Sequence, residues 1–168
     1  VSSSSGPPDV SSFPYAYGVG FSGVYENGIN EARLISPTYE IPLNGTSFLT
    51  FDHWSCSEAG YDGGAVFIKV NGGAWQHFDP GWYSSTAYPS LSHNLAGQGI
   101  FGMDHCTGSS WTGWSSTSGM TNLEANLNAY KGDSVKFKFA FASDTSLQYA
   151  GWFIDNAGVK ISINRYNI

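Results

Sequence analysis

Four carboxylates near the ends of predicted strands have the chemistry of a calcium site. Glu58 and Asp62 fall in one glycine-rich loop, Asp144 ends one predicted strand, and Asp155 lies at the start of the last strand. Calcium takes about six to eight oxygen ligands in flexible geometry, so we predict that these side chains hold a structural calcium ion. The ion would join the 55–64 loop to the closing strand through Asp62 and Asp155. The alternative is that Asp62 and Asp144 cap turns and that Asp155 accepts backbone hydrogen bonds.

The two cysteines form a second candidate site. Cys56 lies in the same acidic loop, and Cys106 lies in a long irregular region. An even number of cysteines in an exported protein favours a disulfide, so we predict a Cys56–Cys106 bond. The alternative is zinc, because His53 and His105 accompany the cysteines and such pairs occur in structural zinc sites. The direct adjacency of His105 and Cys106 fits a tetrahedral site poorly, which favours the disulfide.

Aromatic side chains are scattered through the least regular part of the sequence, residues 79–120. The C–H faces of a sugar pack on aromatic rings, while a few placed polar groups bond its hydroxyls. We therefore predict a glycan-binding surface formed by Trp82, Tyr83, Trp111 and Trp114. The alternative is that these rings pack against their own loops or the core, which is the placement we expect for Trp75 and Trp152.

The sequence carries no catalytic signature. It lacks the His-Glu-x-x-His motif of zinc peptidases and the Gly-x-Ser-x-Gly motif of serine hydrolases. Histidine is the commonest general base, but the spacing of His53, His77, His93 and His105 favours no pair of residues. We therefore expect a non-catalytic binding module.

The elements that position these residues are predicted to be short β-strands. Residues 48–54 and 134–142 alternate apolar and polar side chains, which is the pattern of half-buried strands. Strands 65–70 and 74–78 flank Asn71-Gly72-Gly73, a sequence typical of a type I′ hairpin turn. Further strands are expected at 16–25, around Leu34-Ile35, at 39–43 and at 153–163. Only 120–130 has helical spacing, and we expect one short turn there, so the chain is predicted to be an all-β antiparallel jelly-roll sandwich.

Composition limits the domain count and the partners. The 168 residues suit one domain with its own core. We expect a linker at 1–12, a single β-sandwich domain at 13–163 and a C-terminal tail at 164–168, all cut from a larger secreted protein. With seven Lys plus Arg, a net charge of −6 and no basic cluster in sequence, nucleic acid and anionic membranes are excluded as partners. No apolar run is long enough to span a bilayer, so membrane insertion is not expected.

Asn44-Gly45-Thr46 is a sequon. In a eukaryotic protein Asn44 would be a glycosylation acceptor, whereas in a bacterial protein the triplet has no such meaning.

Several stretches in order resemble one family. The acidic loop ends in Tyr61-Asp62-Gly63-Gly64, and a strand and then Asn71-Gly72-Gly73-Ala74-Trp75 follow it. Residues 139–144 and 151–156 resemble the closing strands of the same family, and 32–37 resembles its opening strand. The chain is therefore similar to the MAM-like jelly-roll domains attached to immune inhibitor A type secreted proteases. The resemblance implies a secreted or cell-surface protein, favours calcium, and makes a protein-adhesion or protease-accessory role the alternative to binding a glycan or another cell-surface ligand.

Overall fold

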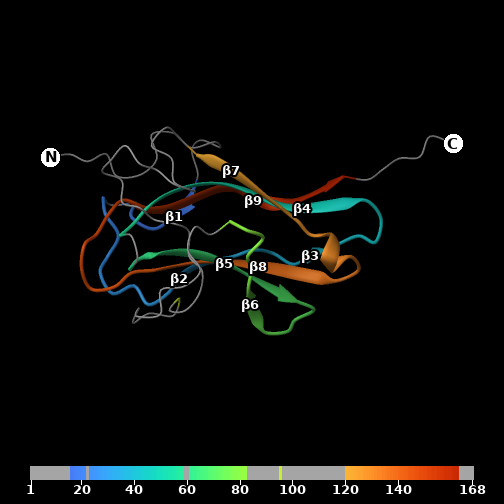
Figure 1. Ribbon diagram of the computed structural model, residues 1–168, viewed down its shortest axis with the longest axis horizontal. Helices are drawn as coiled ribbons and strands as arrows, with labels where there is room; N and C mark the ends of the chain where they lie inside the picture. The colour runs from blue at the N-terminus through green and yellow to red at the C-terminus, as the bar shows by residue number, and fades with distance from the viewer. Residues whose placement is uncertain (1–15, 22, 59–60, 83–94, 96–119, 163–168) are drawn as a thin grey trace.

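Two antiparallel β-sheets face each other as the two layers of a sandwich (Figure 1). The computed structural model describes residues 16–21, 23–58, 61–82, 95 and 120–162. Within these residues the chain passes repeatedly from one layer to the other, as it does between β3, β4 and β5 and again between β6 and β9. The predicted antiparallel jelly-roll sandwich is confirmed. The predicted linker at 1–12 and tail at 164–168 lie outside the described residues.

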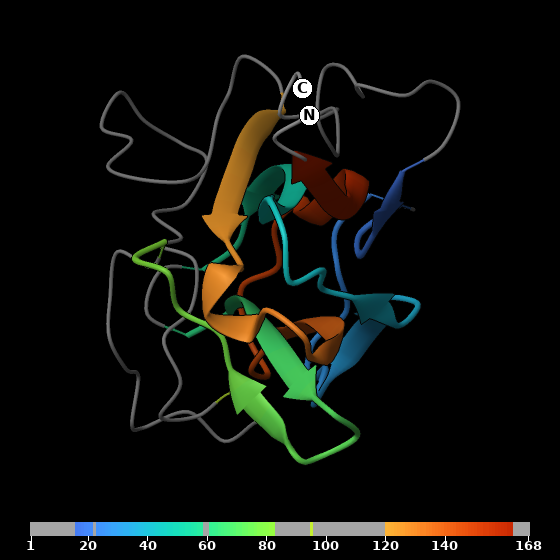
Figure 2. The same cartoon turned by 90° about the vertical axis from the view of Figure 1, so that its right-hand side faces the viewer.

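Each sheet is built from strands that are distant in sequence. The first sheet has the order β1-β9-β4-β7, with bounds Tyr17–Gly18, Gly151–Ser162, Thr46–Cys56 and Thr121–Asn126. The second has the order β2-β8-β5-β6, with bounds Ala32–Ile35, Ser134–Ala142, Gly63–Val70 and Trp75–His77. β3 (Tyr39–Glu40) also pairs with β8. Figure 2 shows the β5–β6 hairpin, drawn in green, on the far side of the molecule from β9, drawn in dark red.

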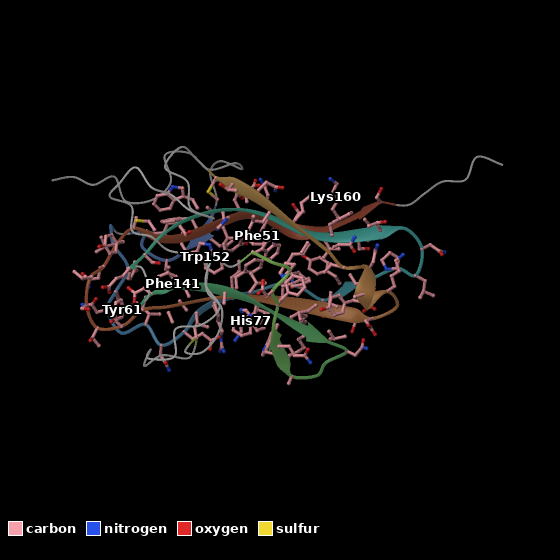
Figure 3. The ribbon with its side chains drawn as sticks, viewed as in Figure 1. Phe51, Tyr61, His77, Phe141, Trp152 and Lys160 are labelled. Carbon is pink, nitrogen blue, oxygen red and sulfur yellow. The ribbon has the colours of Figure 1, made fainter. Side chains whose placement is uncertain are left out.

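Apolar side chains at alternate positions of the strands fill the space between the layers. In β8, Val135, Phe137, Phe139 and Phe141 are each at most 3% exposed, as the sequence pattern predicts. Phe51 of β4 and Trp152 of β9 meet them from the other sheet. Figure 3 shows Phe51, Trp152 and Phe141 between the layers, whereas Lys160 extends from the outer face. Within the described residues no helix is long and apolar enough to cross a membrane.

The predicted hairpin turn is confirmed in detail. Asn71 and Gly72 have φ angles of 49° and 74°. Two consecutive positive φ angles define a type I′ turn. The amide of Gly73 donates to the carbonyl of Val70 at 2.9 Å and closes the turn.

The segment with helical spacing is mostly a strand. Thr121–Asn126 forms β7 and pairs with β4, and only Asn128–Tyr130 forms a short 3-10 helix, η1. The predicted short turn is therefore confined to the end of the segment. Leu123 and Leu127 are four positions apart, a spacing that satisfies a helix and also a strand with period two. Both leucines are buried in the core, so packing against β4 decides between the two.

The two layers are in close contact where Gly64 meets Trp152. A Cβ atom added at Gly64 would lie less than 3.0 Å from three ring atoms of Trp152. The indole Nε1 of Trp152 donates to Nδ1 of His53 at 3.1 Å, so the ring is also held from its own sheet. The inward position of Gly64 in β5 therefore requires a residue without a side chain.

We expect Gly64→Ala to destabilise the protein because the ring of Trp152 would have to move. Overpacking of this kind costs about 1–3 kcal/mol, which lowers the thermal midpoint by several degrees. Gly158→Ala is the matched control, since this glycine lies in β9 and an added Cβ would meet nothing within 4 Å. Equal midpoints for the two variants would contradict the close approach of the sheets at Gly64.

Candidate functional site

The strand pairing brings two acidic loops to the same end of the sandwich. The end of β4 pairs with the start of β9 at Cys56 and Gly151, and the start of β5 pairs with the end of β8 at Gly63 and Ala142. The β4–β5 loop and the β8–β9 loop must therefore lie side by side. Tyr61 marks this end of the molecule in Figure 3.

Three of the four predicted calcium ligands meet there. Glu58 and Asp62 belong to the β4–β5 loop, and Asp144 belongs to the β8–β9 loop. Each offers a carboxylate oxygen, and these oxygens lie within 4.8 Å of one another. Such a cluster of hard oxygen donors suits a cation such as calcium.

Asp62 is the buried member of the cluster. It has no exposed surface, its Oδ2 accepts from the hydroxyl of Tyr25 at 2.6 Å, and its Oδ1 accepts from the amide of Asp144 at 2.6 Å. The same hydroxyl accepts from the amide of Glu58 at 3.1 Å. Asp62 therefore joins both loops to the segment that precedes β2. Tyr25 has no sequence signal for this role, because its partners are 33 and 37 positions away.

The electrostatics of the cluster favour a positive ion. Burial raises the pKa of Glu58, and the neighbouring carboxylates of Asp144 and Asp62 raise it further. The Oε2 atom of Glu58 is buried and has no hydrogen-bond partner. Burial also raises the pKa of Tyr25, as does its hydrogen bond to Asp62, so Tyr25 remains a hydrogen-bond donor. A bound cation would relieve the repulsion and give the oxygen of Glu58 a partner.

Asp155 lies away from this cluster, which corrects the predicted pairing of Asp62 with Asp155. It is opposite Asp52 in the β4–β9 pair, and its Oδ1 accepts from the amide of Asn156 at 2.7 Å. Asp155 is four positions into β9, and a strand rises about 3.3 Å per residue, so the residue lies about 13 Å from the loop end. Its acceptance of a backbone hydrogen bond matches the alternative considered from sequence.

Trp82 does not belong to a binding surface, which corrects a second prediction. It is 4% exposed and packs in the core with its ring against Phe51 and Phe78, at centroid distances of 5.3 and 5.7 Å. The carboxylate of Asp79 accepts from the amides of Gly81 and Trp82, and this turn directs the chain back over the core. The other three predicted glycan-binding residues, Tyr83, Trp111 and Trp114, lie outside the described residues. Trp152 is in the core as expected, and Trp75 is half-buried.

The structure describes Cys56 and Asn44, two of the residues named in the cysteine and sequon predictions. Cys56 ends β4 and is buried, and Cys106 lies outside the described residues, so their disulfide stays a prediction. Asn44 is exposed in the bend before β4.

His53 has a structural role in the core. It is completely buried, and burial lowers its pKa to about 3 against a smaller opposing effect of Asp52. The neutral ring accepts the indole N–H of Trp152. Among the described residues, no group of three metal-binding side chains includes His53. His105 and Cys106, the other members of the zinc alternative, lie outside those residues.

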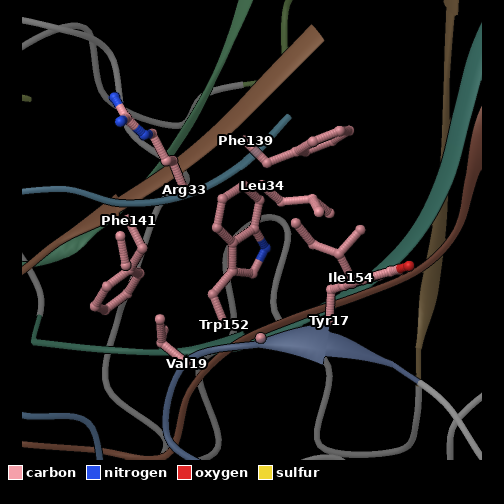
Figure 4. A pocket seen from close by; sticks show the side chains of 10 residues that line it. Tyr17, Val19, Arg33, Leu34, Phe139, Phe141, Trp152 and Ile154 are labelled. Atoms are coloured by element: carbon pink, nitrogen blue, oxygen red, sulfur yellow. The ribbon is translucent and has the colours of Figure 1, made fainter. Parts of the chain in front are cut away.

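An apolar pocket of about 180 Å³ opens between the edge strands β1 and β2. Figure 4 shows the side chains of Phe139, Leu34 and Ile154 around Trp152, while Arg33 points away from them. Binding sites usually combine apolar surface with a few convergent polar groups, and this pocket is instead an extension of the core.

A comparison with models of known protein families finds no match. Among curated proteins, the chain is 29% identical over 153 residues to Bacillopeptidase F of Bacillus subtilis (strain 168). The alignment covers 91% of this chain and 8% of that protein, so the chain spans a small part of the length of its relative. Among solved structures, a family 35 carbohydrate binding module from an environmental isolate aligns with 92% of this chain and 96% of its own, at 9% identity and a TM-score of 0.33.

The fold and the alignment therefore define a β-sandwich module similar to one part of a peptidase. The relative agrees with the protease context of the resemblance noted above. It does not bear on the assignment to MAM-like domains.

We expect Tyr25→Phe to destabilise the protein, because the buried carboxylate of Asp62 loses a hydrogen bond. Removing one partner of a buried polar group costs about 1–3 kcal/mol. Tyr39→Phe is the matched control, since Tyr39 packs against the core and no hydrogen bond of its hydroxyl is found among the described residues. Denaturant unfolding measures both variants, and equal losses of stability would refute the role given to the Tyr25 hydroxyl.

Proposed function

We propose that this chain is a non-catalytic, calcium-stabilised binding module of a larger secreted protein. The observation that carries the proposal is the convergence of Glu58, Asp62 and Asp144 from two loops at one end of the sandwich. Calcium sites of extracellular modules have dissociation constants of about 10⁻⁴–10⁻³ M, and such sites are filled only where free calcium is high. A weak structural calcium site therefore suits a secreted protein.

The residues present fit calcium. Glu58, Asp62 and Asp144 would hold the ion, and the buried Oε2 of Glu58 lacks any other partner. When bound, the ion supplies positive charge that neutralises the three carboxylates. The chain itself supplies the rest of the link, because Tyr25 and the amide of Asp144 already orient Asp62. The link would join the β4–β5 loop to the β8–β9 loop.

For the ligand, we propose a glycan bound through Tyr83, Trp111 and Trp114. The support is compositional: aromatic residues make up 16% of the chain and charged residues 12%, which suits contact with neutral sugar faces. The non-catalytic part of the proposal is supported by the sequence, which lacks the zinc-peptidase and serine-hydrolase motifs considered above.

A role as a peptidase-accessory or protein-adhesion domain is the second candidate. It is favoured by the alignment to a peptidase of which this chain covers 8%. In that case the module would bind a protein, either the substrate of the parent enzyme or a surface to which the enzyme attaches.

Calcium should raise the thermal midpoint of the wild-type protein relative to EGTA. Binding to the native state alone stabilises by about 2.7 kcal/mol at a hundredfold excess over Kd, which corresponds to a rise of several degrees. Glu58→Gln should abolish the response, and Asp155→Asn should keep it. Identical wild-type midpoints in calcium and in EGTA would leave Asp62 and Asp144 as turn-capping carboxylates.

The same response should weaken in acid. Because the pKa of Glu58 in the folded protein is raised above its ordinary value of 4.5, the metal-free folded state binds a proton more tightly than the unfolded chain. The metal-free protein therefore gains stability as pH falls through this raised pKa toward 4.5, while protons displace calcium. The difference between the midpoints in calcium and in EGTA, measured from pH 8 to pH 4.5, should shrink, and a constant difference would exclude Glu58 as a ligand.

A glycan array tests the ligand directly. We expect the wild-type protein to bind at least one glycan and the double variant Trp111→Ala, Trp114→Ala to lose that binding while keeping its thermal midpoint. Failure to bind any glycan would contradict the glycan proposal and favour the accessory role. Binding that survives in the double variant would exclude these two rings as the site.

A further inference from the structure

The outer face of the second sheet gathers most of the positive charge of an acidic protein. In a strand, alternate side chains point to opposite faces, and the positions of Leu34, Ile68 and Phe137 in or against the core identify the inner face. The outer face carries four of the seven Lys plus Arg residues, namely Arg33, Lys69, Lys136 and Lys138. On the same face the register places two carboxylates, Glu31 and Glu40. The whole chain has a net charge of −6.

Two of these lysines face each other across the sheet. Lys69 of β5 is directly opposite Lys136 of β8. Like charges at directly opposite positions destabilise a sheet. Lys138 has an ion pair with Glu31 at 2.6 Å, but within the described part of the chain neither Lys69 nor Lys136 has one. The fold therefore keeps an unfavourable pair of charges that an anionic ligand would relieve.

An aromatic ring stands beside this pair. Trp75 of β6 is opposite Lys69, whose Nζ lies 5.0 Å from the ring centroid, and Nζ of Lys138 lies 5.7 Å from it. Trp75, Lys69 and Lys136 line a groove of about 530 Å³. The hydroxyl-bearing residues Thr38 and Ser134 also line it. Leu95 packs with Ala65 and Ala140 on the same face. The groove lies toward the β5–β6 hairpin, away from that contact.

The arrangement favours one acidic unit of an extended ligand. Lys69 and Lys136 line the groove, whereas Lys138 is only 11% exposed and is paired with Glu31. Small molecules are usually bound in pockets that enclose most of their surface, so this open groove suits one unit of a polymer better than a small anion. The carboxylates of Glu31 and Glu40 on the same face would repel a phosphate backbone as densely charged as that of nucleic acid. A flat ring and hydroxyl groups suit sugar rings better than an acidic peptide.

We propose that this groove binds an anionic polysaccharide, with a carboxylate-bearing sugar on Trp75 and its carboxylate between Lys69 and Lys136. This site goes beyond the proposed function, because it uses other residues, another ligand charge and no calcium.

Binding is measured by affinity electrophoresis in gels that contain polygalacturonate or hyaluronate, each compared with its carboxyl-reduced form. We expect retardation by at least one of the acidic polymers and none by the reduced forms. The double variant Lys69→Gln, Lys136→Gln should weaken binding about tenfold or more, equivalent to about 1.4 kcal/mol. The control Lys131→Gln, Lys160→Gln removes the same charge elsewhere and should bind as the wild type does.

The thermal midpoint separates lost binding from lost folding. The Lys69→Gln, Lys136→Gln variant should melt at or above the wild-type temperature, because a repulsive pair is removed. Lack of binding to both acidic polymers, equal binding to the reduced forms, or equal loss in the control variant would overturn the proposal. Tighter retardation by poly-L-glutamate or by single-stranded DNA would also overturn it in favour of an acidic peptide or a nucleic acid. The Trp111→Ala, Trp114→Ala variant should still bind the acidic polymer, so this test and the glycan array fail independently.

Discussion

The end of the sandwich that carries the candidate site depends on one buried carboxylate. Moving a carboxylate out of water costs several kcal/mol unless hydrogen bonds or an opposite charge compensate it. Asp62 receives its hydrogen bonds from Tyr25 and from the amide of Asp144, so three chain segments must keep their positions for Asp62 to be buried at all. Two further carboxylates beside it increase the negative charge. The calcium ion that we propose would compensate this added charge.

The core behind this end is arranged to hold the same strands in register. Trp152 is the second residue of β9 after the β8–β9 loop, lies against Gly64 of β5, and donates its indole N–H to His53 of β4. One side chain therefore links three of the strands that lead into or out of the two acidic loops. The proposed calcium ligands belong to these loops, and this buried contact holds together the strands that carry the loops.

Features of the fold that depend on neighbouring residues could be predicted from sequence, and features that depend on pairing could not. The turn at Asn71 and the alternation along β8 are local, and both are confirmed. The choice of Asp144 rather than Asp155 as the partner of Asp62 required the register of β9, because both residues flank the same loop. Trp82 follows a predicted strand in an irregular part of the sequence and was therefore predicted to lie on a loop surface. The turn at Asp79 instead places its ring in the core. The pair of facing lysines could not be predicted for the same reason, because Lys69 and Lys136 are far apart in sequence and become neighbours only when β5 pairs with β8.

We propose that Glu58, Asp62 and Asp144 form one calcium site that holds two loops together. Isothermal titration of the metal-free protein with calcium counts the bound ions and measures their affinity in the same experiment. We expect about one ion per chain with a Kd of about 10⁻⁴–10⁻³ M, with binding lost in Asp144→Asn and retained in Asp155→Asn. A folded wild-type protein that takes up no calcium, or an Asp144→Asn variant that binds it as tightly as the wild type, would refute this calcium site.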